Sequence, residues 1–241
     1  MKRFLYRLSE EELSEALAHK PVALEVLQRE GETLTVASYE PLAGLEPIST
    51  EEVGEDWKNW KQNFGPVEVK DFVIMPPWKR PVLINPGTAF GTGLHPTTQM
   101  CIELLSEYVR EGDSVLDVGT GSGILAIVSK LLGAGRVLGI DISKDALRAC
   151  EENAKLNGVK VETSLETPSE IEEPFDVVVA NLEMSIFRKE LKHLLPLYKR
   201  VAIFSGIYGE DELEQFLKLA GTPADYRVVS REDWYCIIVN R

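Results

Sequence analysis

The segment from Ser114 to Ile127 constrains the fold of this chain more than any other, because an apolar run there leads into three glycines at alternate positions. The apolar run is typical of a buried strand, and the residues after the glycines are typical of an apolar helix. Gly119, Gly121 and Gly123 permit a tight turn and let backbone amides approach a ligand at the N-terminus of that helix. This strand–turn–helix unit predicts an open α/β sheet with a ligand site at the turn.

Two carboxylates flank the turn and indicate which ligand it holds. Asp117 precedes the first glycine by two positions, and Asp141 ends the next predicted strand. The dinucleotide fingerprint G-x-G-x-x-G/A is not met, since Ile124 stands where the third glycine would fall. A carboxylate at the end of the second strand can accept hydrogen bonds from both ribose hydroxyls of an adenosine. The combination resembles class I methyltransferases, and a nicotinamide-dependent oxidoreductase is the alternative.

Predicted strands and helices alternate through the second half of the chain. We expect strands over residues 114–118, 136–141, 159–163, 175–180, 200–205, 225–230 and 234–239, and helices over 98–110, 123–132, 144–156, 184–195 and 210–220. This rhythm predicts an α/β fold with a doubly wound, mostly parallel, seven-stranded sheet of the class I methyltransferase kind and helices on both faces. No helix separates the last two strands, so one of them should run antiparallel at an edge.

Residues 1–47 predict a small α+β domain ahead of that sheet. The expected elements are a strand over 4–8, a helix over 10–19, and strands over 22–28 and 33–39. Ser9 and Glu12 form the pattern of a capping box at the start of the helix. A unit of this size buries little apolar surface by itself, which is typical of an appendage.

Residues 48–66 are polar and predict a linker between the small domain and the catalytic domain, 67–241. Within the linker, Trp57 and Trp60 lie three positions apart, on one face of a predicted helix. They either pin the linker helix to the main body or form an aromatic surface for the substrate. Short strands are expected over 73–75 and 82–84, near the start of the catalytic domain.

The net charge of −13 restricts the class of partner. Residues 1–57 carry 13 Asp and Glu against 5 Lys and Arg, so the acidic excess is concentrated at the start of the chain. This balance disfavours direct binding to nucleic acid, which relies on Lys and Arg at the phosphates. It suits a basic protein substrate on the small domain, although net charge also serves solubility alone.

Three scattered cysteines, Cys101, Cys150 and Cys236, form no C-x-x-C pair. Their number and spacing disfavour a disulfide framework and a zinc site, and we expect no metal cofactor. The longest apolar runs, such as 177–180 and 236–239, are too short to span a bilayer, and the N-terminus lacks the apolar core of a signal peptide. We therefore expect no membrane association and a cytoplasmic location.

Asn181 ends the predicted strand at 175–180 and is the candidate catalytic residue. Amino-group methyltransferases resemble one another in carrying Asn or Asp here, where a side-chain oxygen accepts a hydrogen bond from the amine. Enzymes that act on nucleobases or glutamine amides usually continue with Pro-Pro and an aromatic residue, whereas this chain continues with Leu, Glu and Met184. The alternative role for Asn181 is N-cap of the following helix.

Five motifs then occur in an order that resembles the PrmA family of ribosomal-protein methyltransferases. They are Asn85–Thr98, Asp117–Gly123, Gly139–Asp141, Val179–Leu182 and Ser205–Ile207. The resemblance covers residues from about 55 to 241. The small acidic domain is similar to the family's substrate-recognition domain, which is mobile on its linker. The family modifies ribosomal large-subunit protein eleven.

The resemblance implies roles for particular residues. Those expected to contact S-adenosylmethionine are Thr98, Gly119, Asp141 and Asn181, with Phe90 and Gly121 lining the same pocket. Leu94 departs from the polar residue often found at its position, and His95 is open to two roles, general base or structural hydrogen-bonding group. The implied reaction methylates lysine side chains and the N-terminal α-amine of free ribosomal protein eleven and releases S-adenosylhomocysteine. The alternatives are a lysine methyltransferase for another protein, and a non-catalytic ribosome-assembly factor that binds the methyl donor.

Overall fold

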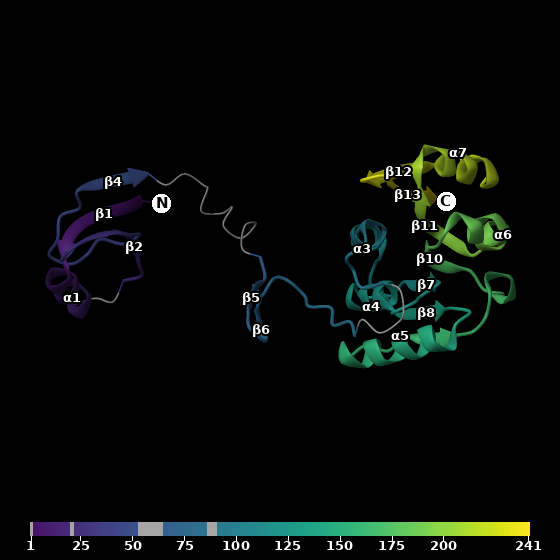
Figure 1. Ribbon diagram of the computed structural model, residues 1–241, viewed down its shortest axis with the longest axis horizontal. Helices are drawn as coiled ribbons and strands as arrows, with labels where there is room; N and C mark the ends of the chain where they lie inside the picture. Colours follow the sequence, from purple (N-terminus) through teal and green to yellow (C-terminus); the bar gives the residue numbers. More distant parts are fainter. Residues whose placement is uncertain (1, 20–21, 53–64, 86–90) are drawn as a thin grey trace. The chain divides into compact units, whose positions relative to one another are not determined.

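The computed structural model describes residues 2–19, 22–52, 65–85 and 91–241. The chain divides into two compact units, Met1–Arg80 and Pro81–Arg241 (Figure 1). The predicted linker helix with Trp57 and Trp60 lies outside the described residues, as does Phe90. No helix in the described part of the chain combines the length and apolar character needed to cross a membrane.

The first unit begins with a four-stranded antiparallel sheet of order β2-β3-β1-β4. Its elements are β1 (Lys2–Ser9), α1 (Glu10–His19), β2 (Leu24–Glu30), β3 (Thr33–Ser38) and β4 (Ser49–Glu52). A small core holds the sheet and the helix together, and its buried members are Tyr6, Leu8, Ala16, Leu34, Val36 and Leu42. The strand–helix–strand–strand order predicted for residues 4–39 is confirmed.

The capping box at the start of α1 is also confirmed. The amide of Ser9 donates to Oε2 of Glu12 (2.8 Å), and the amide of Glu12 donates to Oγ of Ser9 (3.2 Å). The hydrogen bond from the Ser9 backbone lowers the pKa of Glu12, because it stabilises the carboxylate. The two reciprocal bonds satisfy amides that a helix terminus would otherwise leave unpaired.

Strand β4 extends this sheet past residue 47, into the segment predicted to be linker. It pairs antiparallel with β1, from Lys2 opposite Glu52 to Leu5 opposite Ser49. Its sequence, Ser-Thr-Glu-Glu, has no apolar alternation, and all four residues are exposed. Strand β4 is defined only by its backbone hydrogen bonds to β1. The sequence did not predict it, because strand prediction relies on alternating apolar residues, which β4 lacks.

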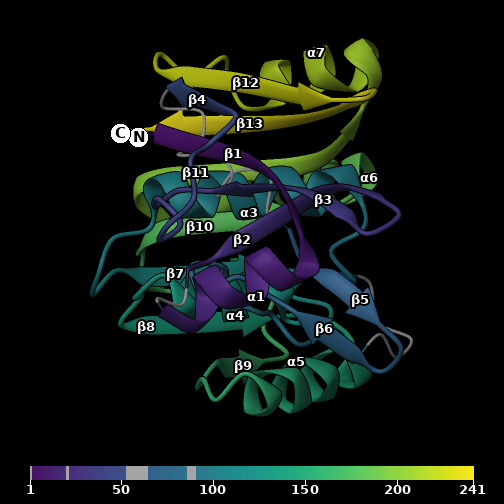
Figure 2. The ribbon, with the colours of Figure 1, turned by 90° about the vertical axis from the view of Figure 1, so that its left-hand side faces the viewer.

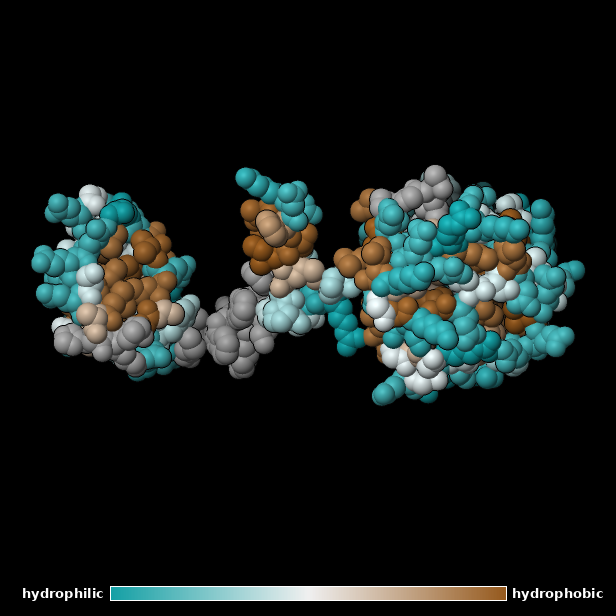
Figure 3. Space-filling view, turned by 90° about the horizontal axis from the view of Figure 1, so that it is seen from below, coloured by the Kyte–Doolittle hydropathy of each residue, from teal (hydrophilic) through white to brown (hydrophobic). Residues whose placement is uncertain are grey.

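Residues 65–85 contain one hairpin, formed by β5 (Val67–Val69) and β6 (Phe72–Ile74). Its apolar side chains are exposed, Phe72 to 73%, and Figure 3 shows them as a compact hydrophobic group. The strand predicted over 82–84 is not formed. Instead the backbone of Leu83 exchanges hydrogen bonds with the side chain of Asn157 (2.8 and 2.7 Å), so this one side chain takes the place of a partner strand.

The second unit contains the predicted seven-stranded sheet, of order β12-β13-β11-β10-β7-β8-β9, and these strands follow one another from top to bottom in Figure 2. The strands are β7 (Ser114–Val118), β8 (Arg136–Ile140), β9 (Glu162–Ser164), β10 (Phe175–Asn181), β11 (Tyr198–Tyr208), β12 (Tyr226–Arg231) and β13 (Trp234–Asn240). The helices are α3 (Pro96–Tyr108), α4 (Ile124–Leu131), α5 (Lys144–Leu156), α6 (Met184–Leu194) and α7 (Gly209–Leu219), with a short 3₁₀ helix η2 (Pro168–Glu170).

Helices cover both faces of this sheet, as predicted. Along β10, Val177 and Val179 contact the core formed with α3 and α4, whereas Val178 and Ala180 contact the core formed with α6 and α7. Alternate side chains therefore serve two cores, which explains why the strand is apolar at every position from 177 to 180. The two cores fix the strand ends, where the ligand site lies.

The antiparallel strand is one position in from the edge, which corrects the prediction. Strand β13 pairs antiparallel with both β11 and β12, and β12 is the edge strand. Residues 236–239 are fully buried, whereas Tyr226 and Arg227 of β12 are exposed. A continuous apolar run such as 236–239 is typical of a strand inside a sheet, with a paired strand on each side. This pattern would have predicted that β13 is the inner strand and β12 the edge strand.

Candidate active site

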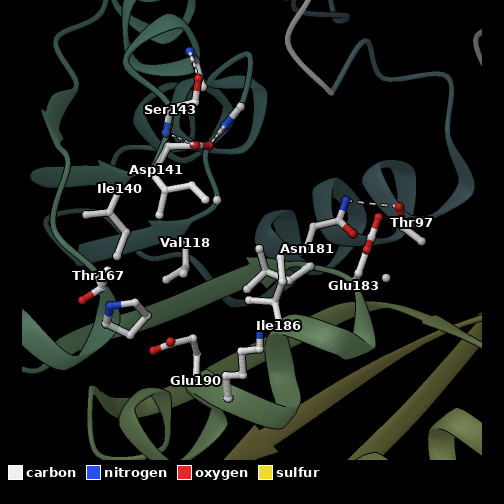
Figure 4. Close-up of a pocket in the computed structure, with 18 of the residues that line it drawn as sticks. Thr97, Val118, Ile140, Asp141, Ser143, Thr167, Asn181, Glu183, Ile186 and Glu190 are labelled. Atoms are coloured by element: carbon white, nitrogen blue, oxygen red, sulfur yellow. Dashed lines mark hydrogen bonds between the residues drawn. The ribbon is translucent and has the colours of Figure 1, made fainter.

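A cleft of about 820 Å³ opens at the carboxyl ends of the parallel strands in the second unit (Figure 4). Residues that line it follow or end four strands: Gly119 after β7, Asp141 after β8, Asn181 on β10 and Gly206 near the end of β11. Strands β7 and β10 are neighbours, and the chain winds away from them in opposite directions. Open α/β sheets bind ligands at such a switch point, and this volume suits a small molecule.

The glycine turn after β7 brings backbone to the cleft. Gly119, Gly121 and Gly123 all have left-handed backbone conformations, with φ of 72°, 54° and 82°. A Cβ built on Gly119 would lie 2.5 Å from Cδ2 of Leu182, which itself lines the cleft. A side chain at Gly119 would therefore collide with Leu182, so glycine lets the turn pack closely against Leu182 at the edge of the cleft.

Asp117 holds this turn from within the protein. Its side chain is buried, and Oδ2 accepts hydrogen bonds from Oγ1 of Thr120 (2.7 Å) and from the amide of Ala126 (3.1 Å). The Ala126 amide belongs to the first turn of α4, where backbone donors lack partners within the helix. Burial raises the pKa of Asp117 to about 7. Asp117 is thus a structural residue of the turn.

Asp141 joins the turn to the next strand and faces the cleft. Its Oδ2 accepts a hydrogen bond from the amide of Gly121 (3.1 Å), and its Oδ1 accepts one from the amide of Ser143 (2.9 Å). Each carboxylate oxygen has further acceptor capacity. The two backbone bonds therefore orient the side chain and leave lone pairs for two neighbouring hydroxyls, such as those of a ribose.

Asn181 is oriented by a chain of polar contacts. Its Nδ2 donates to Oγ1 of Thr97 (3.1 Å), and Oγ1 of Thr97 lies 2.8 Å from Nδ1 of His95. The ring of His95 packs edge-on against Trp234, with centroids 4.7 Å apart. Since the amide nitrogen of Asn181 is engaged, its oxygen is the group available to a substrate. The N-cap of α6 is Glu183, so Asn181 does not have the alternative role of helix cap.

His95 has a structural role in this arrangement. It is the N-cap of α3, where its side chain accepts a hydrogen bond from the amide of Thr97. The Nδ1 atom of His95 is thus engaged at the helix terminus, while the residue also lines the cleft. The structural role that the sequence leaves open for His95 is therefore present, and the role of general base stays a prediction.

The structure brings four of the six predicted ligand-binding residues, Gly119, Gly121, Asp141 and Asn181, into one cleft. Thr98 is placed differently: among the described residues, Thr97 forms part of the wall instead. Thr98 is buried, and its hydroxyl has no hydrogen-bond partner in the described part of the chain. Phe90 lies outside the described residues. The roles assigned to Thr98 and Phe90 stay predictions.

Sequence reasoning missed several residues of the cleft wall. They include Thr97, Pro168, Ile186, Glu190 and Trp234. Thr97 adjoins a predicted residue, and the first turn of a helix presents successive residues to different neighbours, so either threonine could have been chosen. Glu190 and Trp234 lie in no motif, and only the fold brings them to the cleft.

The fold and this cleft define a class I S-adenosylmethionine-dependent methyltransferase. Residues present in the cleft fit an adenosine-bearing methyl donor, because the backbone at Gly119 and Gly121 borders the cleft and Asp141 offers paired acceptors. Residues 9–241 match the family model described as "Ribosomal protein L11 methyltransferase (PrmA)". The chain therefore belongs to that family.

Curated relatives and a solved structure agree with this assignment. The ribosomal protein L11 methyltransferase of Aquifex aeolicus (strain VF5) is 53% identical, and the match covers 100% of this chain and 98% of the relative. That of Thermotoga neapolitana is 33% identical over 99% of this chain and 97% of the relative. The crystal structure of the ribosomal protein L11 methylase from Lactobacillus delbrueckii subsp. bulgaricus matches with a TM-score of 0.59 and 30% identity, over 74% of this chain and 99% of that structure.

Proposed function

We propose that this chain methylates amines of ribosomal protein L11, both lysine side chains and the N-terminal α-amine, with S-adenosylmethionine as methyl donor. The observation that carries the proposal is the orientation of Asn181. Its nitrogen is engaged by Thr97 at 3.1 Å, which leaves its oxygen as a hydrogen-bond acceptor in a cleft that also holds Asp141. The names of the curated relatives supply the protein substrate.

When bound, S-adenosylmethionine supplies an activated methyl group on a sulfonium sulfur, and loss of that methyl leaves S-adenosylhomocysteine. The residues that would hold it are Asp141 at the ribose hydroxyls and the turn from Gly119 to Gly121, whose backbone borders the cleft. The Asn181 oxygen accepts a hydrogen bond from the substrate amine, which turns the lone pair of the amine nitrogen toward the methyl carbon. Alignment of this kind lowers a barrier by several kcal/mol.

The amine must be neutral before it can attack, and the reference pKa of lysine is about 10.4. Leu182, Ile186 and Trp234 contribute apolar surface to the cleft. Such surroundings disfavour an ammonium ion and lower the pKa of an amine that enters. The proton leaves to solvent, so the proposal assigns no side chain as a strong general base.

The proposal assigns substrate recognition to the small domain at residues 1–47. Acidic side chains concentrate there, and strand β2 is an exposed edge of its sheet, with Val26 and Leu27 accessible. A basic protein would complement this surface, and an open strand edge can add a strand from a partner. A cytoplasmic location, and no membrane, nucleic-acid or metal partner, complete the proposal.

The test is intact-mass analysis of purified ribosomal protein L11 after incubation with this enzyme and isotopically labelled S-adenosylmethionine. We expect the protein mass to rise in steps of one methyl group, and fragment masses to place the label on lysines and the N-terminal amine. An Asn181→Ala variant should give almost no label while it still binds S-adenosylhomocysteine. An unchanged mass with wild-type enzyme would contradict the proposal, and binding without transfer would indicate the assembly-factor alternative.

A further inference from the structure

One carboxylate in the cleft serves neither the ribose nor the amine in the proposed reaction. Glu190 lies on α6 and lines the cleft, yet it takes no part in holding Asn181, Asp141 or the glycine turn. Its Oε2 atom is buried and has no hydrogen-bond partner among the described residues. A buried polar atom without a partner is destabilising, and protein interiors rarely contain one. The geometry therefore indicates that a ligand supplies the missing hydrogen-bond donor.

The position of Glu190 shows which part of a ligand it would meet. Figure 4 shows Thr97 and Asn181 on one side of the cleft and Thr167 and Glu190 on the opposite side. Asn181 lies at the reacting end, and Asp141 offers the acceptors for a ribose. A methyl donor whose ribose is held at Asp141 and whose sulfur is directed to Asn181 would extend its adenine base toward the side of Glu190.

The surroundings of Glu190 suit a flat heterocycle. Ile142 directly follows Asp141, lines the cleft and is 84% exposed, so it offers an uncovered apolar surface. Pro168 and Ile186 line the same cleft and add apolar walls. Apolar walls with one unsatisfied acceptor match a planar base that carries one outward-facing amine.

Resting on the proposed function, we propose that Glu190 accepts a hydrogen bond from the exocyclic amine of the adenine and thereby selects adenosine over its 6-oxo counterpart. A 6-oxo purine presents a carbonyl oxygen at that place, so two acceptors would face each other across a buried contact. A site built to bond an amine rejects an analogue without one, because the buried partner is left unpaired.

Glu166 is the matched control. It also lines the cleft, but its side chain is exposed, so water can satisfy its carboxylate. If Glu166 were the residue that reads the amine, the selectivity would depend on it and not on Glu190. The Glu190→Gln and Glu166→Gln variants remove one charge each with little change in shape.

The experiment is isothermal calorimetry with two ligands, S-adenosylhomocysteine and S-inosylhomocysteine. We expect wild-type enzyme to prefer the adenosine compound by roughly ten- to a hundredfold, the usual effect of one hydrogen bond to a charged group. Glu190→Gln should bring this ratio close to one, because an amide can donate as well as accept. Glu190→Ala should also lower the ratio, through weaker binding of S-adenosylhomocysteine, while Glu166→Gln should keep the wild-type ratio.

Three results would overturn the assignment. A wild-type ratio in both Glu190 variants would remove Glu190 from recognition, and loss of selectivity in Glu166→Gln would transfer the role to Glu166. If wild-type enzyme bound neither compound, the proposed function would fail together with this inference. Thermal unfolding of each variant establishes that the compared proteins are folded.

Discussion

The side-chain amide of Asn181 donates a hydrogen bond to the hydroxyl of Thr97 across 3.1 Å, and this bond joins the end of β10 to the first turn of α3. The two residues are 84 positions apart in the chain. An amide group can present either its oxygen or its nitrogen to a substrate, and this bond determines that the oxygen faces the amine. Thr97 is therefore a positioning residue for Asn181.

We predict that Thr97→Val lowers kcat by roughly ten- to a hundredfold, because a misoriented amide no longer aligns the amine. Valine retains the shape of threonine without its hydroxyl, so the binding of S-adenosylhomocysteine should change little. Thr97→Ser, which keeps the hydroxyl, should restore most of kcat. Steady-state kinetics and calorimetry on the two variants measure both effects, and a wild-type kcat in Thr97→Val would show that Asn181 needs no such partner.

The buried Asp117 makes stability depend on pH. Burial raises the pKa of Asp117 to about 7 from a reference value of 3.8, so between these values the folded protein holds a proton that the unfolded chain has lost. The contribution of Asp117 to stability is therefore fully present below pH 3.8 and is lost as the pH rises through about 7. The slope of the unfolding free energy is at most about 1.4 kcal/mol per pH unit.

Asp117→Asn should remove this dependence, since asparagine still offers an acceptor to Thr120 and Ala126 but does not titrate there. Urea unfolding of both proteins at several pH values gives the comparison. We expect the stability of the wild type relative to the variant to decrease between pH 5 and 7 and then to level off. A constant difference across that range would mean that Asp117 titrates at its ordinary value in the folded protein.

Two glycines beside Leu182 should differ in their tolerance of a methyl group. At Gly206 (φ 90°) an added Cβ would lie 2.3 Å from the carbonyl oxygen of Leu182, whereas at Gly119 (φ 72°) it would meet the end of the Leu182 side chain. A side-chain end can move and a backbone carbonyl in a packed turn cannot. We predict a loss of roughly 1–2 kcal/mol for Gly119→Ala, mainly from the left-handed backbone, and roughly 3 kcal/mol or more for Gly206→Ala.

Thermal or urea unfolding of the two alanine variants checks this order. Equal losses would indicate that the backbone near Leu182 yields more readily than its packing suggests. Gly119→Ala should in addition weaken the binding of S-adenosylhomocysteine, because the new methyl group would displace the side chain of Leu182, which lines the cleft.

The first sheet ends at Glu52, so a clean test of the small domain removes residues 1–52. All described residues of the cleft belong to the second unit, and the truncated enzyme should bind S-adenosylhomocysteine as the full chain does. Methylation of ribosomal protein L11 should fall by roughly a hundredfold or more, since binding energy remote from the reacting amine is lost. A short lysine peptide at high concentration is the control, and its slow methylation should persist. Normal methylation of L11 by the truncated enzyme would show that the small domain does not recognise the substrate.

Local sequence patterns predict the second unit well where an element is long or buried. The bounds of β7 and α5 are those that the sequence predicts, because apolar runs, a glycine turn and helical periodicity all mark them. Strand β9 is predicted over 159–163 but spans Glu162–Ser164. The amide of Val159 instead donates to the carbonyl of Ala154, which completes the end of α5. The residues after α5 could either complete the helix end or begin the short edge strand β9. The sequence pattern does not distinguish these two outcomes.

The residues of the site also differ in how well the sequence predicts them. The four predicted residues that line the cleft lie at the ends of strands or in the turn after one: Gly119, Gly121, Asp141 and Asn181. The ends of parallel strands meet at one edge of a sheet, so order along the chain predicts that they lie together. Glu190 occupies an ordinary position on an amphipathic helix, and nothing in its neighbours along the sequence distinguishes it from a solvated glutamate. Its significance comes from burial of a single oxygen atom, which only the packed structure reveals.

The position of β13 between β11 and β12 has a consequence for the biosynthesis of the protein. A ribosome releases β12 before β13, yet β12 pairs only with β13 among the described strands and so cannot join the sheet when it emerges. Until β13 inserts, one side of β11, from Val201 to Tyr208, remains open to pairing with other chains. A nascent chain stalled before Trp234 would carry the complete glycine turn and Asn181 but an unfinished sheet, whose open strand edge makes that intermediate prone to aggregation.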